Sequence, residues 1–227
     1  MFIKEYYLLY KMGKREMTPR ERTSRALSKL LRHSADKREI PHDEMGGIKL
    51  ETIIGLPEFI ERNVTSEQIS EIVDTSDKKR FIIYKDEDDN TMVRAAQGHS
   101  IKISQQAAMR EITLENLNTL NIDIGRIIHG TYYKSWSLIK QRGLNKMRRL
   151  HIHFAKGLPE DGSVVSGMRT TCELVIYLDI VAALNAGLKF YLSENGVILT
   201  PGDNEGYLDK RYFSSVIDRA SGNIIPV

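Results

Sequence analysis

The sequence of 227 residues contains one cysteine, Cys172, and no apolar run long enough to cross a bilayer. A single cysteine excludes an internal disulfide and a metal site made of cysteines alone. The first residues, MFIKEYYLLYKMGK, are too polar for a secretory signal peptide. These absences predict a soluble, cytoplasmic protein that does not bind a membrane.

The chain also lacks the familiar glycine-rich nucleotide-binding patterns. No G-x-G-x-x-G follows a predicted strand, and no G-x-x-x-x-G-K-[ST] loop is present. Neither a Rossmann site nor a P-loop site is supported, so any bound nucleotide would need another kind of site.

Neither sign of charge dominates. The 33 Lys and Arg against 30 Asp and Glu give a net charge of +3, and a phosphate site depends on how cations are arranged rather than on their total. Arginines stand beside the motif-like stretches of the sequence, at Arg32, Arg94, Arg148, Arg149 and Arg169.

The first half of the chain predicts helices followed by a β-hairpin. Thr18 and Glu21 form a capping-box pattern for a helix that runs to about Ser34. A second helix starts at Thr65 or Ser66, and two strands follow around the acidic turn KDEDDN. This order indicates a winged-helix arrangement.

The second half predicts strands with short helical inserts, which gives a mixed α+β fold overall. RIIHGTYY and ELVIYLD are typical of strands, Gly143 ends a short helix, and Asn195-Gly196 marks a hairpin. The polar stretch 104–125 separates the two patterns. We expect one domain over residues 1–115, with an N-terminal extension, and another over residues 116–227.

His151 and His153 share one face of the alternating segment RLHIHFA, opposite Leu150, Ile152 and Phe154. Two histidines could ligate a metal, but no nearby Asp, Glu or Cys has the spacing to complete a ligand set. They could instead be half-exposed strand histidines, or they could contact the polar groups of a ligand.

The arginines have alternative explanations as well. Cations such as Arg32 and His33 at the end of a helix are favoured by the helix dipole, by about 0.3–1 kcal/mol. Arg94 and Arg169 could be solvated arginines at the edges of strands or turns. However, SGMR places Arg169 after a small-residue turn whose backbone N–H groups could help to hold an anion.

Six motifs, taken in their order along the chain, resemble the RNA 2′-phosphotransferase family over roughly residues 23–205. They are LSKLLRH (27–33), RAAQGHS (94–100), HGT (129–131), RLHIHFA (149–155), SGMR (166–169) and NGVILTPG (195–202). The resemblance implies an N-terminal winged-helix lobe that binds RNA and a C-terminal, ADP-ribosyltransferase-like lobe that binds NAD. Such a lobe binds NAD without a Rossmann fingerprint.

The resemblance also implies a reaction. The family transfers an internal 2′-phosphate of RNA, left at a splice junction, to NAD as a co-substrate and without a metal. The expected products are RNA with a 2′-hydroxyl, nicotinamide and ADP-ribose 1″,2″-cyclic phosphate, formed through a 2′-phospho-ADP-ribosylated RNA intermediate. The expected partner is RNA carrying a 2′-phosphate, in particular tRNA, and the expected oligomeric state is a monomer.

The family's catalytic Arg-His-Arg-Arg quartet corresponds to Arg32, His33, Arg94 and Arg169. The resemblance further implies cofactor contacts from His129, Gly130, Thr131, Arg149, His151 and Ser166, and contacts to RNA or phosphate from Gln97, Gly98, His99 and Ser100. Two other functions stay open: an ADP-ribosyltransferase that caps terminal phosphates of RNA or DNA, and a non-catalytic RNA-binding module.

Overall fold

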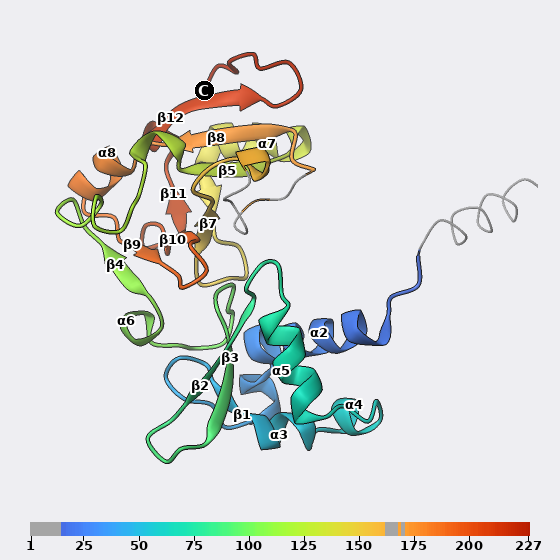
Figure 1. Cartoon of the computed structure of the whole chain (residues 1–227). Helices are drawn as coiled ribbons and strands as arrows, with labels where there is room; N and C mark the ends of the chain where they lie inside the picture. Colours follow the sequence, from blue (N-terminus) through green and yellow to red (C-terminus); the bar gives the residue numbers. More distant parts are fainter. Residues whose placement is uncertain (1–14, 162–167, 169–170) are drawn as a thin grey trace, which may run out of the picture.

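The computed structural model describes residues 15–161, 168 and 171–227. Two groups of elements, each with its own hydrophobic core, lie one above the other (Figure 1). We call residues 15–104 the N-terminal half and the described residues from 105 onward the C-terminal half.

Helix α2 (Pro19–Lys29) opens the N-terminal half and starts as its sequence predicts. The Thr18 side chain accepts from the backbone N–H of Glu21, and the Glu21 carboxylate accepts from the N–H of Thr18. The helix does not keep its α-helical pitch to Ser34. It continues as a wider π-helical turn, η1 (Leu30–Ser34), and then as a short 3₁₀ turn, η2 (Asp36–Arg38).

A three-stranded antiparallel sheet completes the N-terminal half. Its strand order is β1 (Ile48–Lys49), β3 (Thr91–Ala95) and β2 (Phe81–Lys85), and the β2–β3 hairpin is the one that the acidic turn predicts. Helices α3 (Leu50–Ile54), α4 (Pro57–Ile60) and α5 (Ser66–Asp74) pack around it with α2. Thr65 caps α5 with a second capping box. Leu27, Leu31, Phe59 and Val93 lie in this core with no exposed surface.

The C-terminal half is built on small antiparallel sheets. One has the order β4 (Arg110–Ile112), β9 (Phe190–Leu192), β10 (Ile198–Thr200) and β7 (Ile152–Phe154). Another has the order β12 (Phe213–Asp218), β8 (Leu174–Leu178) and β5 (Ile128–Thr131), and β11 (Tyr207–Leu208) pairs with β6 (Leu144–Asn145). The helical elements are α6 (Gln105–Ala108), η3 (Ile124–Arg126), α7 (Tyr133–Arg142), η4 (Pro159–Asp161), α8 (Ile180–Asn185) and η5 (Lys210–Tyr212).

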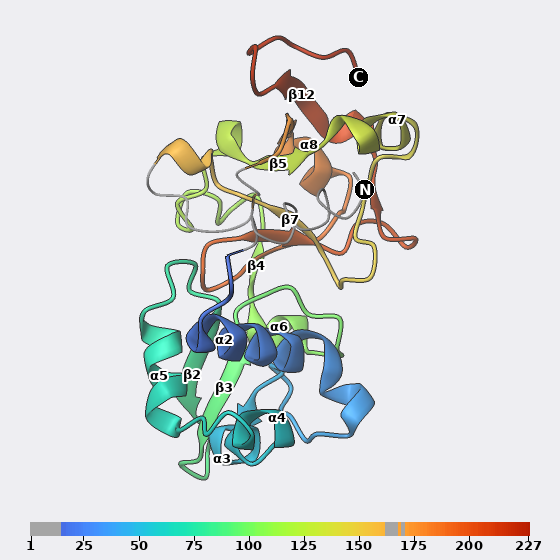
Figure 2. The same ribbon diagram turned by 90° about the vertical axis from the view of Figure 1, so that its right-hand side faces the viewer.

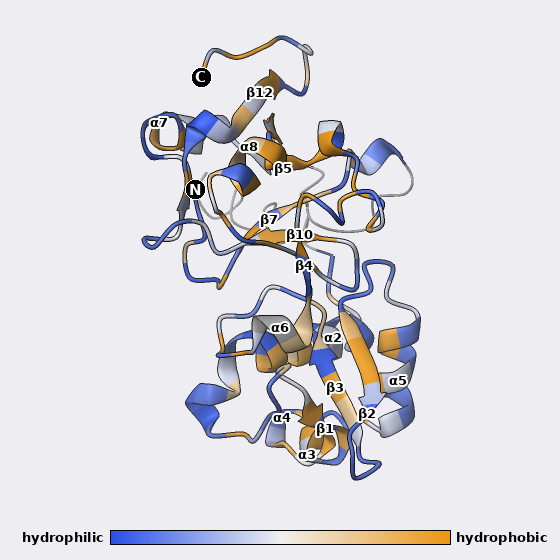
Figure 3. Ribbon diagram, turned by 90° about the vertical axis from the view of Figure 1, so that its left-hand side faces the viewer, coloured by the Kyte–Doolittle hydropathy of each residue, from blue (hydrophilic) through white to orange (hydrophobic). Residues whose placement is uncertain are grey.

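The two larger sheets of the C-terminal half meet where β5 passes β7. Ile128 and Ala155 exchange two backbone hydrogen bonds of 3.0 and 2.8 Å, which tie the start of β5 to the end of β7. β10 is an apolar strand, whereas the connecting loops are mostly hydrophilic (Figure 3). Phe154 of β7, Ile176 of β8 and Phe190 of β9 lie in the hydrophobic core of this half.

The mixed α+β class is confirmed, with two differences in detail. The polar stretch 104–125 contains α6 and β4, and β4 pairs with β9 even though it precedes residue 115. The division at residues 115 and 116 stays a prediction. None of the helices among the described residues is long and apolar enough to cross a membrane.

The connection between the end of α7 and the start of β6 requires a glycine at position 143. Gly143 has φ +83° and ψ −176°, a conformation essentially restricted to glycine. A Cβ at this position would clash with the carbonyl oxygen of Leu208 in β11. Gly187 has the same φ of +83°, but a Cβ there would have no atom within 4 Å.

We expect Gly143→Ala to lower the free energy of unfolding by roughly 3 kcal/mol, and the matched control Gly187→Ala by about 1 kcal/mol. Both substitutions add the strain of a positive φ, but only the first adds the clash with β11. Urea unfolding of the two variants measures the difference. Equal losses would contradict the close approach of α7 and β11.

Candidate functional site

The π-helical turn η1 carries Arg32 and His33 at the end of α2. The carbonyl of Arg32 accepts the backbone N–H of Ser100 at 2.7 Å and that of Ile101 at 3.3 Å, instead of a helical partner. The last carbonyls of any helix lack partners within the helix. Here that property joins the helix end to the loop that follows β3, so that residues 32–33 and 98–100 lie side by side.

Gly98 lies directly against the side chain of Arg32. A Cβ on Gly98 would be 3.6 Å from Cδ and Nε of Arg32, which is ordinary contact. The φ of Gly98 is +87°, so the backbone conformation rather than the available space calls for glycine. Gln97 lies in the same loop and is half-buried.

A short hydrogen-bond chain determines which nitrogen of His33 carries the proton. Nδ1 of His33 lies 3.0 Å from Oγ of Ser100, and that hydroxyl donates to the carbonyl of Arg32 at 3.3 Å. Because the hydroxyl proton is used in this way, Oγ accepts from Nδ1–H. The lone pair of His33 is therefore on Nε2. Burial and the charges of Arg32 and Arg149 lower the pKa of His33, which favours the neutral ring.

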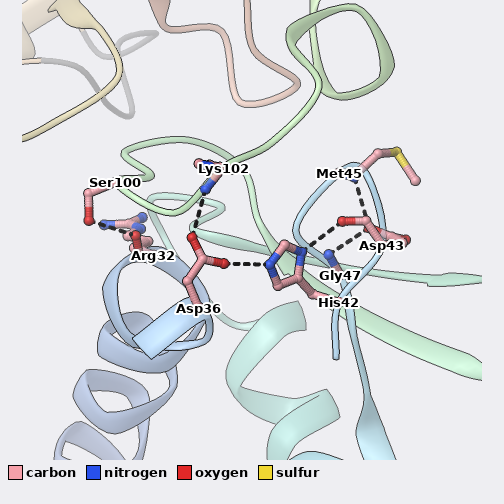
Figure 4. Close-up of polar contacts among 8 residues, drawn as sticks. All are labelled: Arg32, Asp36, His42, Asp43, Met45, Gly47, Ser100 and Lys102. Carbon is pink, nitrogen blue, oxygen red and sulfur yellow. Dashed lines mark hydrogen bonds and ion pairs between the residues drawn. The ribbon is translucent and has the colours of Figure 1, made fainter. Parts of the chain in front are cut away.

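A second network holds the same loop from the other side (Figure 4). Asp36, just after η1, accepts from the backbone N–H of Lys102 at 3.0 Å and contacts Nε2 of His42 at 2.7 Å. His42 Nδ1 donates to the carbonyl of Asp43 at 2.9 Å. This network holds Lys102, and the Arg32 carbonyl holds Ser100, so both ends of residues 100–102 are fixed relative to the helix.

Arg94 brings a guanidinium group from β3 and is only 3% exposed. It forms a salt bridge with Glu194, which lies on the turn between β9 and β10 of the C-terminal half and is 55% exposed. Its guanidinium carbon also lies 5.9 Å from the centre of the Tyr84 ring. A buried cation from one half is thus bonded to an accessible carboxylate from the other.

Buried histidines continue from this point into the C-terminal half. The His99 carbonyl accepts from the N–H of Leu150 at 3.0 Å, which links the loop after β3 to the segment before β7. His99, His151 and His153 are 3%, 4% and 8% exposed. His129, on β5, donates from Nδ1 to the carbonyl of His153 at 2.8 Å, because a carbonyl can only accept.

Burial is the main cause of the low pKa values of these rings. It lowers the pKa of His99 to about 3, together with the charges of Arg32 and Arg94. It lowers the pKa of His151 to about 4 with Lys146, and that of His153 to about 3 with Arg149. Burial and the neighbouring cations Arg149 and Arg80 also lower the pKa of Arg32 to about 10, so Arg32 stays charged.

Several buried polar side-chain atoms in this region have no hydrogen-bond partner among the described residues. They are Nε and Nη2 of Arg32, Nε and Nη1 of Arg94, and Nε2 of His99, His151 and His153. Buried polar atoms are normally hydrogen-bonded, and an unpaired buried guanidinium edge is costly. The combination of charge and unused donors is suited to a polyvalent anion such as a phosphate.

The remaining predicted residues lie farther along the chain. Gly130 and Thr131 are on β5, where Thr131 is 6% exposed and a Cβ on Gly130 would clash with Met168 and Cys172. Arg149 is exposed just before β7. Ser166 and Arg169 lie outside the described residues, so three members of the predicted quartet are placed here.

The alternatives for the two strand histidines can now be compared. The alternative of half-exposed rings does not hold, because His151 and His153 are both buried. The described residues contain no group of three or more His, Cys, Asp or Glu side chains that could hold a metal ion. Buried rings with unused Nε2 atoms are the arrangement expected for contacts to a ligand.

Sequence reasoning missed Glu194, Arg80 and the pair of Asp36 and His42. Glu194 belongs to a hairpin turn that the Asn195-Gly196 pattern predicts, but nothing local indicates that its carboxylate reaches Arg94. Asp36 and His42 are close in sequence to the motif that contains Arg32, and this proximity was the only available signal.

Comparison with known proteins identifies similar sequences over most of the chain. The profile of the RNA 2′-phosphotransferase, Tpt1 / KptA family matches residues 18–202. The tRNA 2′-phosphotransferase 1 of Danio rerio is 40% identical over 85% of this chain and 83% of its own length. The tRNA 2′-phosphotransferase 1 of Homo sapiens is 38% identical over 90% of this chain and 80% of its own length. The tRNA 2′-phosphotransferase of Saccharomyces cerevisiae is 32% identical over 78% and 76%.

The buried histidines predict a defined pH dependence. At about pH 6 we expect neutral rings at His99, His151 and His153. His42 is the internal control: burial opposes its charge, but the Asp43 carbonyl and the Asp36 carboxylate outweigh burial and raise its pKa. Ring ¹⁵N chemical shifts followed against pH distinguish the two groups, and joint titration of all four rings would contradict the burial described here.

The sign of the stability change follows from the same shifts. The unfolded chain binds protons at its histidines near pH 6.5, whereas the three buried rings bind them only near pH 3–4. The contribution of these rings to the free energy of unfolding is therefore complete above about pH 6.5 and is lost as the pH falls toward about 4. Urea unfolding at a series of pH values measures this loss.

Proposed function

Because the chain belongs to the RNA 2′-phosphotransferase family, we propose that it removes a 2′-phosphate from RNA by transferring it to NAD. We further propose that the substrate is tRNA, in line with the names of its relatives. In this proposal the N-terminal half is a winged-helix, RNA-binding lobe and the C-terminal half is an ADP-ribosyltransferase-like lobe.

One observation carries the proposal. Two guanidinium groups from different elements, Arg32 and Arg94, present buried donors that no described residue uses. They lie next to His33, His99 and Ser100, and the backbone of the loop fixes this arrangement. A phosphate with several oxygens can accept from both guanidinium groups at once, which offsets the cost of their burial.

Within this site the arginines would bind the phosphate oxygens. A guanidinium is planar, stays charged at neutral pH and can donate two parallel hydrogen bonds to a phosphate. Preplaced donors of this kind stabilise negative charge that builds on the oxygens during transfer. We propose Arg169 as a third phosphate ligand, with Gln97 and His99 shaping the pocket around the phosphate.

His33 is the proposed proton carrier. Its Nδ1 is held by Ser100, so Nε2 is the atom that can take up or release a proton. The low pKa of the ring leaves Nε2 unprotonated at neutral pH. A general base must be both correctly protonated and within reach of its proton, and the link to Ser100 serves both requirements.

The unpaired polar atoms on the C-terminal side fit a dinucleotide that carries two phosphates. His151 and His153 offer buried Nε2 atoms, and Thr131 lies next to Gly130 on β5. We propose that His129, Gly130, Thr131, Arg149, His151 and Ser166 hold NAD. When bound, NAD supplies the electrophilic ribose carbon, and the overall reaction yields 2′-hydroxyl RNA, nicotinamide and ADP-ribose 1″,2″-cyclic phosphate.

The direct test uses a short RNA with one internal 2′-phosphate, incubated with and without NAD. We expect loss of the phosphate only with NAD, with ADP-ribose cyclic phosphate as a product, and unchanged turnover in EDTA. Terminal capping would instead yield ADP-ribosylated RNA without the cyclic phosphate. An RNA-binding module would release no nicotinamide.

Arg32→Lys and Arg94→Lys test the role of the guanidinium groups. Each substitution keeps the charge but removes the planar pair of donors, so kcat/KM should fall by about 10²-fold or more. Arg110→Lys is the control, because Arg110 is exposed on β4. Steady-state kinetics at a fixed salt concentration gives the comparison, and wild-type rates in both site variants would refute the assignment.

Ser100→Ala tests the control of the His33 tautomer. Without Oγ, the proton of His33 is free to move to Nε2, and we expect kcat to fall by roughly tenfold while KM for RNA changes little. Ser100→Thr retains the hydroxyl and should restore activity. The ¹⁵N shifts of His33 report the tautomer directly, so an unchanged tautomer in Ser100→Ala would contradict this role whatever the rate.

A further inference from the structure

A groove of about 640 Å³ lies along α2, between this helix and the segments that carry Arg38, Glu58 and Arg62. Its lining includes Arg22, Arg25 and Lys29 from α2, and Arg38 and Arg62 from the neighbouring elements. Figure 2 shows α2 lying across the front of the N-terminal half, below the C-terminal half. The groove is thus a basic surface formed mainly by one helix.

The acidic side chain in the lining, Glu58, is already neutralised. Its two oxygens accept from the guanidinium of Arg38, one of them at 3.1 Å, and its backbone carbonyl accepts from Arg62. Arg22, Arg25 and Lys29 are exposed and make no salt bridge with any described residue. The positive charge of the groove is therefore available to a partner.

The spacing of Arg22, Arg25 and Lys29 along the helix matches the spacing of phosphates along a nucleic-acid strand. Positions 22, 25 and 29 recur every three or four residues, so they share one helical face. They span seven residue steps, or about 10 Å along the axis. Each strand of a nucleic-acid duplex carries one charge per about 3.4 Å of axis, so this length corresponds to about three phosphates.

The groove and the candidate site belong to one continuous run of helix. The groove lining reaches Leu30 and Ser34, and the same turn, η1, also carries Arg32 and His33. Because residues two apart on a helix do not face the same side, an RNA strand whose 2′-phosphate is held by Arg32 passes around the end of α2 to reach the groove.

We propose that Arg22, Arg25 and Lys29 bind the phosphodiester backbone of the RNA next to the reacting nucleotide, so that the groove recognises the length of the RNA rather than its bases. This inference rests on the function proposed above. In this proposal α2 contributes binding energy only to an RNA long enough to reach the groove, and a dinucleotide substrate gains none of it.

The test compares two substrates with one double variant. The substrates are a dinucleotide with a 2′-phosphate and the same dinucleotide extended by several nucleotides on either side. The variant is Arg25→Gln with Lys29→Gln. The control removes the same two charges from another exposed helix, as Lys134→Gln with Arg142→Gln on α7.

For the extended RNA we expect the groove variant to raise KM by roughly tenfold with little change in kcat, whereas its kinetics on the dinucleotide stay at wild-type values. Binding of labelled extended RNA, measured by fluorescence anisotropy without NAD, should lose about 0.7 per removed contact in its log–log salt slope for a single strand. The α7 variant should match the wild type in each assay.

An equal effect of the groove variant on both substrates, or an unchanged salt slope, would overturn this inference. Wild-type protein that processes neither RNA would overturn the proposed function instead. The anisotropy measurement separates the two failures, because it needs no turnover. When the RNA is extended on the 5′ side or on the 3′ side separately, the extended RNA that binds the groove variant more weakly gives the direction in which the strand runs along α2.

Discussion

The hydrogen bond from the Ser100 amide to the Arg32 carbonyl, at 2.7 Å, is the contact on which the site depends. It joins the end of the first helix to the loop after β3, two segments separated by more than sixty residues of chain. The π-helical turn brings the carbonyl to this position, and such turns recur at functional sites. Together with the bonds of the Ser100 hydroxyl and of Asp36 to Lys102, this bond holds Arg32, His33, Gly98 and Ser100 in one geometry.

Much of the local structure could be predicted from the sequence because its causes are local. The capping boxes at Thr18 and Thr65, the end of α7 at Gly143 and the hairpin at Asn195-Gly196 all form as predicted. Asp179 caps α8 in the same way, because its side chain accepts from the N–H of Ala182 at 2.9 Å. In each case two or three neighbouring residues determine the backbone.

The parts that could not be predicted depend on contacts between distant residues. The alternation of RLHIHFA correctly indicated a strand, but its histidines are buried as well as its apolar residues, and the His151 ring packs edge-on against Tyr191 of β9. The pairing of β4 with β9 gave no signal in the polar stretch that contains it. The family resemblance pointed to Arg32, His33 and Arg94, which lie around the loop after β3. Hydrophobic periodicity and helix-end rules alone explained them as ordinary helix-end or strand-edge residues.

The turn between β9 and β10 joins the two halves through side chains as well as position. Glu194 bonds Arg94, and the Asn195 amide donates to the carbonyl of Lys78 at 3.2 Å. Each half therefore completes the polar surface of the other. If the halves were produced as separate polypeptides, the first would expose a guanidinium that is 3% accessible in the whole chain and would lack its carboxylate. Replacing one half with the corresponding half of another protein would therefore also require a replacement for its partner in the Arg94–Glu194 pair.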